Sequence, residues 1–274
     1  MNLIHFRDMY RTDYNLKHLF AMNQHWKNAS SFSMGIPRQT SAFLFFRNGC
    51  AVYDFPNGET MPVRQGSLVY IPQGSQYVTH FRTSRSEPVH TQLLEFELID
   101  AEGYSFAAMK QVTVLDSVRF KYYAEIFDEL IEIYAATPYA LSLMKSKVYG
   151  LLYEISKSFH YEKIYSKTFL PIAKGILYME QVISYDQPIA EIARMCNVSD
   201  SCFRRLFQQY SGISPSEYKM QKLIHQAKAL LRSGNLTILE VSSRLGFDDP
   251  EYFSRVFKRK TGMTPSEYSD QFYR

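Results

Sequence analysis

The chain has 274 residues, enough for two domains of about 100 to 200 residues each. Hydrophobic residues make up 46% and charged residues 21%, which is typical of packed globular proteins and excludes disordered or collagen-like chains. The formal net charge of +4 is modest but uneven, with +3 of it from residue 168 onward, and this asymmetry is only weak evidence for a polyanionic partner. The sequence has no apolar run of ~18 residues and no N-terminal signal-like stretch, so we expect a cytoplasmic protein without a membrane partner.

The chain carries little that indicates enzyme chemistry. Cys50, Cys196 and Cys202 are too few for a disulfide framework and form no C-x-x-C pair, so we expect reduced thiols. The seven histidines are scattered singly. No Ser/His/Asp, paired-carboxylate or phosphate-loop pattern stands out. The sequence therefore predicts no metal, no cofactor and no catalytic residue.

Residues 41–100 have the pattern of short β-strands. Runs of β-branched and aromatic residues are separated by turn signals at Asn48-Gly49, Asn57-Gly58, Gln65-Gly66 and Gln73-Gly74. Turns repeated at this short, regular spacing favour an antiparallel barrel or sandwich.

Two helices are expected next, at residues 118–134 and 139–159, because apolar residues recur there at helical spacing. We place the turn that joins them near Thr137-Pro138. The polar segment 160–167 is expected to be a linker. The predicted domains are therefore residues 1–162 and residues 168–274.

The C-terminal domain contains an internal repeat. Residues 203–218 read FRRLFQQYSGISPSEY, and residues 253–268 read FSRVFKRKTGMTPSEY. The preceding apolar positions also match, at an offset one residue shorter. Each copy reads as helix, turn, helix, which predicts two helix-turn-helix motifs at about residues 188–210 and 238–260.

The second helix of each copy has one apolar face and one polar face. Such a helix can enter a major groove, where arginine bridges guanine O6 and N7. We expect the outward residues Ser201, Arg204, Arg205 and Gln208 in the first copy, and Glu251, Ser254, Arg255 and Lys258 in the second, to contact DNA.

A third helix is expected between the two copies. Ser214-Pro215-Ser216-Glu217 has the pattern of a capping box, and the helix that follows extends toward Gly234. At ~1.5 Å per residue its length of about 28 Å approaches the ~34 Å between successive major-groove faces. One chain is therefore expected to reach two adjacent grooves of double-stranded DNA.

Residues 169–272 resemble the DNA-binding domain of the AraC/XylS family of bacterial transcription regulators, and residues 245–268 match the family signature closely. The resemblance implies that Ser201, Arg204 and Arg205 contact bases, and that the second recognition helix carries Glu251, Ser254 and Arg255. It also implies a homodimer formed through the two helices at 118–159, a small-molecule effector, for which a sugar is the family habit, and contact with RNA polymerase. Because Glu251 would repel phosphate, the second copy is the weaker base reader.

The N-terminal half looks cupin-like. Residues 66–77 resemble the second cupin motif, but Tyr77 stands where that motif has a metal-binding histidine, and no histidine lies near 49–58. We therefore expect a cupin-like antiparallel β-barrel without metal, followed by the two-helix dimerisation element and the all-α tandem helix-turn-helix domain. The resemblance to sugar-sensing regulators implies effector contacts at Arg47, Tyr77, Thr79 and Thr91. The alternative is that threonine and tyrosine merely suit strands and that Arg47 pairs with a carboxylate.

The sequence thus predicts a ligand-responsive, DNA-binding transcription regulator. Three alternatives remain: a metal-independent cupin-type enzyme, an effectorless regulator controlled by a protein partner, and an interaction module in which the helical repeat binds protein. Stoichiometric iron, manganese or zinc would instead indicate a metal-dependent enzyme built on the barrel, and DNA binding that is insensitive to salt would support the interaction module.

Overall fold

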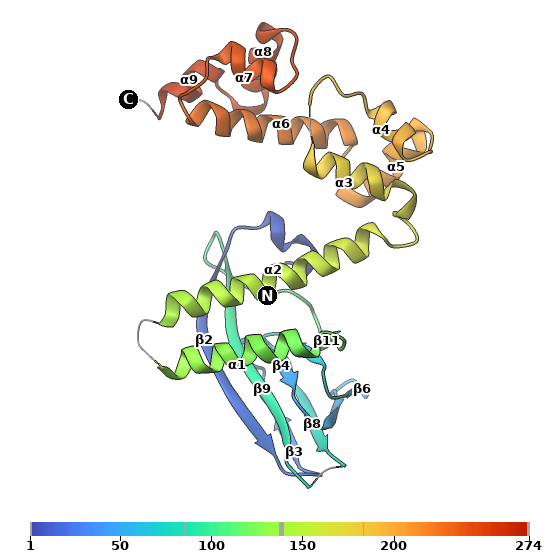
Figure 1. Cartoon of the computed structure of the whole chain (residues 1–274), viewed down its shortest axis with the longest axis vertical. Helices are drawn as coiled ribbons and strands as arrows, with labels where there is room; N and C mark the ends of the chain where they lie inside the picture. The colour runs from blue at the N-terminus through green and yellow to red at the C-terminus, as the bar shows by residue number, and fades with distance from the viewer. Residues whose placement is uncertain (1, 85, 137–139, 183, 273–274) are drawn as a thin grey trace. The chain divides into compact units, whose positions relative to one another are not determined.

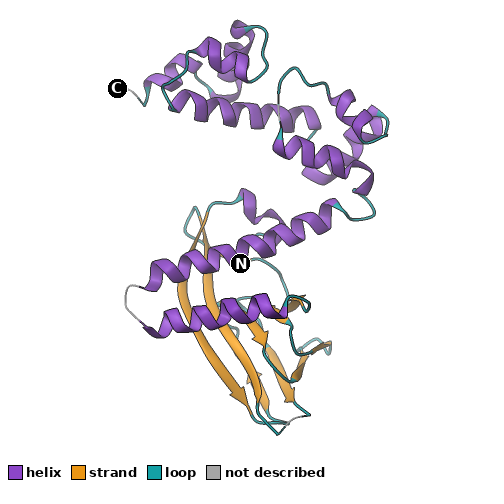
Figure 2. Ribbon diagram, in the orientation of Figure 1, coloured by secondary structure: helices purple, strands orange, loops and turns teal. Residues whose placement is uncertain are grey.

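The computed structural model describes residues 2–84, 86–136, 140–182 and 184–272 (Figures 1 and 2). The chain divides into two compact units, Met1–His160 and Tyr161–Arg274. Each unit has two clusters of buried apolar side chains.

The first unit contains a short 3-10 helix at Phe6–Arg11 and two β-sheets. Its strands are β1 Asn2–Leu3, β2 Tyr14–Trp26, β3 Ser31–Met34, β4 Ser41–Phe46, β5 Cys50–Asp54, β6 Thr60–Val63, β7 Leu68–Ile71, β8 Tyr77–Arg82, β9 Val89–Asp100, β10 Ser105–Ala107 and β11 Thr113–Asp116. The larger sheet has the order β1-β10-β9-β4-β7-β11, with β2 also paired to β9. The smaller sheet has the order β3-β8-β5-β6.

The predicted fold class, antiparallel β followed by all-α, is confirmed. Among the described strands only β1 and β10 pair in parallel. The sheets do not close into a continuous barrel, because β6 and β11 are each paired on one edge only within the described part of the chain. The Asn48-Gly49 signal marks a turn that requires glycine: φ is +70°, and a Cβ there would lie 2.7 Å from Val89 Cγ2.

Successive side chains along β4 point to opposite faces of the larger sheet, and so into two separate hydrophobic cores. Leu44 and Phe46 point between the two sheets, whereas Phe43 and Phe45 point to the opposite face of the larger sheet. Helices α1 Phe120–Ala136 and α2 Ala140–Ile164 cover that opposite face (Figure 2). The larger sheet is therefore buried on both faces, which explains why all six residues of β4 are buried.

The two helices extend beyond their predicted ends. The expected turn at Thr137-Pro138 lies outside the described residues. The segment expected to be a linker, 160–167, is helical as far as Ile164. Ile164 is fully buried in the core of the second unit, and this burial explains why the helix continues past the polar residues that suggested a linker.

Beyond the end of α2, the regular elements in the described residues of the second unit are all helices. They are the 3-10 helix η2 Leu170–Ile172, α3 Ala173–Gln181, α4 Ile189–Met195, α5 Asp200–Ser211, α6 Pro215–Arg232, α7 Ile238–Arg244, α8 Pro250–Thr261 and α9 Pro265–Asp270. The pairs α4–α5 and α7–α8 correspond to the two copies of the sequence repeat, and α6 runs between them (Figure 1).

Local capping explains most helix boundaries in this unit. Ser199 caps α5 by accepting from the backbone N of Cys202, and Asp249 caps α8 ahead of Pro250. The capping box expected at Ser214 and Glu217 is only half formed. Ser214 Oγ accepts from the backbone N of Glu217, but the Glu217 carboxylate accepts instead from Lys260 Nζ at 2.8 and 2.9 Å. A tertiary ion pair has displaced the local contact.

Candidate nucleic-acid interface

Helix α5 presents a polar face to solvent. Phe203, Leu206, Phe207 and Tyr210 are buried in the core around α3 and α4. The four residues predicted to contact DNA from this helix, Ser201, Arg204, Arg205 and Gln208, are all exposed. The amphipathic division expected from the sequence is therefore the one that the structure has.

The two arginines of α5 differ in whether their guanidinium groups already have hydrogen-bond partners within the protein. Arg204 Nε donates to Asp200 Oδ2 at 2.8 Å, and its guanidinium also donates to Ser216 Oγ at 3.3 Å. Arg205 makes no hydrogen bond or ion pair with any residue that the structure describes. Arg205 is thus the arginine of α5 whose five donors are available to a base edge, while Arg204 is already oriented by a carboxylate.

Helix α8 repeats the arrangement with a different charge pattern. Phe253, Val256 and Phe257 are buried, and Glu251, Arg255 and Lys258 are exposed. Ser254 is half-buried, and its hydroxyl donates to the Pro250 carbonyl at 2.9 Å, so it points back along the helix.

The N-terminal end of α8, from the two residues before the helix into its first turn, is acidic. Asp248, Asp249 and Glu251 are exposed there, and Arg255 lies 3.6 Å from the Asp249 carboxylate. The last turn carries the cations Lys258, Arg259 and Lys260. In helix-turn-helix proteins the N-terminal end of the recognition helix contacts bases, so carboxylates at this end favour phosphate repulsion over base reading. The structure thus gives α5 the face better suited to reading bases.

The two recognition helices are separated by α6, which is 18 residues long. At ~1.5 Å per residue this gives about 27 Å, close to the ~34 Å repeat of the major groove. Both belong to one compact unit, so one domain carries two groove-sized polar faces.

A family model described as a helix-turn-helix domain matches residues 192–271. The HTH-type transcriptional activator RhaR of Cronobacter sakazakii is 39% identical over 74 residues, 26% of this chain and 26% of that protein. The arabinose operon regulatory protein of Escherichia coli is 44% identical over 67 residues, 24% of this chain and 23% of that protein. The chain thus covers about a quarter of the length of these relatives.

Other comparisons extend over more of the chain. The Msm operon regulatory protein of Streptococcus mutans is 26% identical over 169 residues, 56% of this chain and 60% of that protein. A crystal structure of an apo ToxT variant from Vibrio cholerae aligns with 92% of this chain and 96% of its own, at 15% identity and a TM-score of 0.41.

The C-terminal region is therefore a tandem helix-turn-helix domain. More specifically, it is an AraC-family domain, since the relatives that match it include the arabinose operon regulators and RhaR. The resemblance inferred from the repeat is confirmed.

In the N-terminal unit, the four predicted effector residues do not share one site. Tyr77 and Thr79 line a space between the sheets, and Thr91 is buried on the same side, where its hydroxyl accepts from Trp26 Nε1 at 2.9 Å. Arg47 lies on the helical side of the larger sheet, where it donates to Asp128 Oδ2 of α1 at 3.1 Å. Arg47 therefore pairs with a carboxylate, which is the alternative given in the sequence analysis.

The space between the sheets is almost filled. Its volume is about 40 Å³, roughly one water molecule, because aromatic rings occupy it. Trp26 stacks on Phe81 with ring centroids 4.3 Å apart, and Tyr53 lies 5.1 Å from Tyr77. Burial raises the pKa of Tyr77, so its phenol stays neutral.

Sequence reasoning missed a buried charge in this space. Arg38, 8% exposed, pairs with Glu95 and donates to the Tyr77 hydroxyl at 3.5 Å. Arg38 precedes β4 between Pro37 and Gln39, a composition that reads as an exposed loop. Nothing in its local pattern could have indicated burial.

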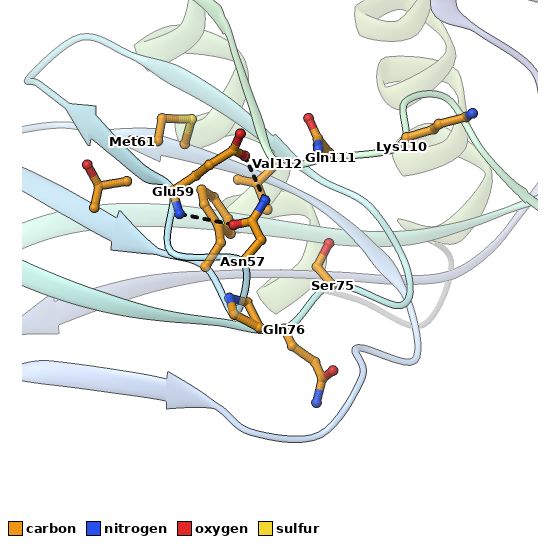
Figure 3. Close-up of a pocket in the computed structure, with 11 residues that line it drawn as sticks. Asn57, Glu59, Met61, Ser75, Gln76, Lys110, Gln111 and Val112 are labelled. Carbon is orange, nitrogen blue, oxygen red and sulfur yellow. Dashed lines mark hydrogen bonds between the residues drawn. The ribbon is translucent and has the colours of Figure 1, made fainter.

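A larger pocket opens at the end of the β5–β6 hairpin (Figure 3). Its volume is about 610 Å³, within the range of small-molecule sites. Phe55, Met61 and Val112 supply apolar surface, and carboxamides surround them. Figure 3 shows Asn57 and Glu59 hydrogen-bonded to each other and the Lys110 side chain extending away from them.

Among the described residues, no group of three His, Cys, Asp or Glu side chains is arranged to hold a metal ion. In the same part of the chain, no helix is both long and apolar enough to cross a membrane.

Proposed function

We propose that this protein is a sequence-specific DNA-binding transcription regulator. The observation that carries the proposal is the pair of amphipathic helices α5 and α8, held in one unit and each with an exposed arginine, Arg205 and Arg255, at equivalent positions. The relatives that match this region are named as transcription regulators, which supports the same activity. Because DNA is the proposed partner, we place the protein in the cytoplasm and assign it no enzymatic role.

Within this proposal, Arg205 reads a guanine through a bidentate contact, and Arg204, Ser201 and Gln208 support it on the same face. Arg255 and Lys258 of α8 contribute mainly phosphate contacts, because Glu251 and its acidic neighbours lie nearest the bases. Ser254 is a weaker candidate, since its hydroxyl is engaged by the helix backbone.

Selection from a random duplex library tests the proposal. The full chain should enrich a defined sequence, and its affinity for that duplex should fall steeply with salt. Arg205→Ala should cost ~1 to 3 kcal/mol on the selected duplex and relax the preference at one base pair. Lys258→Ala is the matched control, and it should weaken selected and random duplexes alike.

Two results would overturn these assignments. If no sequence is enriched and binding ignores salt, the helical repeat is a protein-interaction module. If Arg205→Ala weakens selected and random DNA equally, Arg205 is a phosphate contact and another residue reads the base.

We also propose that the N-terminal unit senses a small molecule. The pocket bounded by Phe55, Met61 and Gln76 offers the volume, whereas the space lined by Tyr77 and Thr79 would have to expand first. A sugar is the effector class that the family suggests. Arg47 and Thr91 remain candidate contacts for a ligand that rearranges the sheet.

Thermal melting against sugars, sugar phosphates and small metabolites distinguishes these sites. A ligand at 100 times its Kd should add about 2.7 kcal/mol of stability. Met61→Trp, which fills the outer pocket, should abolish the shift, while Thr79→Val should preserve it; the reverse result would place the effector between the sheets. No shift with any compound favours an effectorless regulator controlled by a protein partner.

The protein is further proposed to be a homodimer that contacts RNA polymerase when it activates. Support for the dimer comes from α2, whose outward face exposes Leu143, Gly150 and Tyr153. Leu143 and Tyr153 are 51% and 60% exposed, which is costly for large apolar side chains on an isolated chain.

A further inference from the structure

We propose that residues 184–188, between α3 and α4, form a clasp that fixes the two recognition helices relative to one another and so sets the spacing of DNA subsites that the domain accepts. This inference rests on the DNA binding proposed above. The clasp immediately precedes the first helix-turn-helix copy in the chain, but its contacts are with the turn of the second.

Tyr185 makes the central contact. Its backbone N donates to the Leu245 carbonyl at 2.8 Å. Its ring stacks on Phe247, with centroids 4.2 Å apart and planes 13° apart, and it lies 5.7 Å from the Tyr252 ring at the start of α8. Leu245 and Phe247 are themselves buried in the core of the second copy. The clasp is therefore attached to the packed part of that copy.

Lys219 of α6 holds the clasp from the other side. Its Nζ donates to the carbonyls of Tyr185 at 2.8 Å and Gln187 at 2.7 Å. The ammonium also lies 5.5 Å from the Tyr185 ring centroid. Two carbonyl acceptors and an aromatic face bind one cation, so the segment has little freedom to swing away from α6.

Comparing the two copies indicates that the close packing of the clasp over the end of a helix is specific to the second copy. Gly246 corresponds to Asn197 of the first copy, and both have a positive φ, +78° and +56°. A Cβ at Gly246 would overlap Ser184 Oγ and lie 3.0 Å from Asp186 Oδ1. Asparagine can therefore stop the first helix, but the second needs glycine because the clasp crosses directly over it.

A further ion pair ties the second recognition helix to α6. Lys260, in the last turn of α8, contacts both carboxylate oxygens of Glu217 in the first turn of α6. Lys222 donates to the Met179 and Glu180 carbonyls at the end of α3. Helix α6 is thus bound to both copies, and the clasp closes the connection between them.

If the two recognition helices are held rigidly, the domain can fit only a narrow range of spacings between its DNA subsites. Each added base pair moves the next subsite by about 3.4 Å and turns it by about 34° around the duplex axis. A rigid pair of recognition helices fits one spacing, whereas a flexible pair follows the displaced subsite. The clasp therefore determines how strongly the domain discriminates between spacings.

The test compares duplexes with one base pair inserted or deleted between the two footprinted subsites of the selected sequence. The wild-type chain should lose about tenfold or more in affinity on either duplex. Tyr185→Ala should lose less than about threefold, because its copies can reorient. Tyr165→Ala, an exposed tyrosine of the same unit, is the matched control and should behave as wild type. Equal spacing penalties in Tyr185→Ala and wild type would overturn the inference.

A second variant and a DNA-free measurement keep the test decisive. Lys219→Met keeps the aliphatic stem but removes both hydrogen bonds, so it should relax spacing if Tyr185→Ala proves too unstable. Spin labels at Gln209→Cys and Arg259→Cys, with the native cysteines replaced, report the distance between α5 and α8. The distribution should be narrow in the clasped chain and broader in either variant.

These outcomes separate the two proposals. A chain that selects no DNA sequence refutes the regulator function, yet the distance distributions still report on the clasp. Distributions equally narrow with and without the clasp contacts would refute the inference, even in a chain that binds its DNA sequence tightly.

Discussion

Single residues in this protein differ most from expectation where a charge is buried. Arg38 is the clearest case, because its partner Glu95 lies 57 positions further along the chain. A guanidinium removed from water is stable only while a carboxylate and hydrogen-bond acceptors face it. The Arg38–Glu95 pair therefore holds the loop before β4 against β9.

Glu95→Gln should destabilise the first unit by about 3 kcal/mol, the lower end for breaking a buried pair, since the Glu95 side chain is 29% exposed. Urea unfolding measures the loss. Glu125→Gln, at a carboxylate that is 67% exposed, should change the unfolding free energy by less than about 0.5 kcal/mol. A Glu95→Gln chain as stable as wild type would mean that Arg38 finds another acceptor.

At the scale of elements, one carboxylate joins β11 to α1. Asp116 Oδ1 accepts from the backbone N of Val118 at 2.7 Å, and Oδ2 accepts from Arg119 and from the Tyr123 hydroxyl. Burial alone would raise the pKa of Asp116, but these hydrogen bonds outweigh it and lower the pKa below its ordinary value.

The lowered pKa makes this junction sensitive to acid. A carboxylate with a depressed folded pKa contributes stability above its unfolded pKa of ~3.9, and this contribution is lost as the pH falls through the folded value. The unfolding free-energy difference between wild type and Asp116→Asn should thus be constant from pH 7 to about 5 and shrink below about pH 4. Asp13→Asn, at an exposed carboxylate, is the control variant. A difference independent of pH would remove Asp116 from the acid response.

The N-terminal cap of α7 is expected to contribute measurably to the stability of the second unit. Thr237 and Glu240 form a complete capping box at α7, with Glu240 Oε2 accepting from the Thr237 backbone N at 2.7 Å. Thr237→Ala should cost ~1 kcal/mol and lower the Tm of the second unit by about 4 °C. Ser266→Ala, beyond the cap of α9, should leave the Tm unchanged. Identical melting of the two variants would show that packing alone starts α7.

The whole molecule should be dimeric if the apolar face of α2 is covered. Light scattering at tens of micromolar should give twice the chain mass. Leu143→Glu with Tyr153→Glu should give the monomer, because each chain would bury two carboxylates, four in all, at a two-fold interface. Lys121→Glu on α1, at a 91% exposed side chain, is the control and should stay dimeric. A monomeric wild-type chain would contradict the proposal.

Much of the fold was predictable because the relevant interactions are local. The change from a period of two to a period of 3.6, the turn at Asn48-Gly49 and the cap at Asp249 all depend on residues close together in the chain. The repeat identified both recognition helices, since identical patterns bury identical faces. The exposed face of α5 followed from the burial of Phe203 and Phe207.

The remaining features were decided by the tertiary structure alone, because each of them depends on contacts between residues that are far apart in the sequence. Arg47 faces Asp128 and not the inter-sheet space, and Arg38 is buried while its neighbours are polar. Glu217 leaves its capping box for Lys260, 43 residues away. Gly246 looks like an ordinary helix stop until residues 184–186 are seen to cross it. Helix periods and caps follow from neighbouring residues, whereas buried charges, pockets and the clasp arise only when distant segments compete for the same partners.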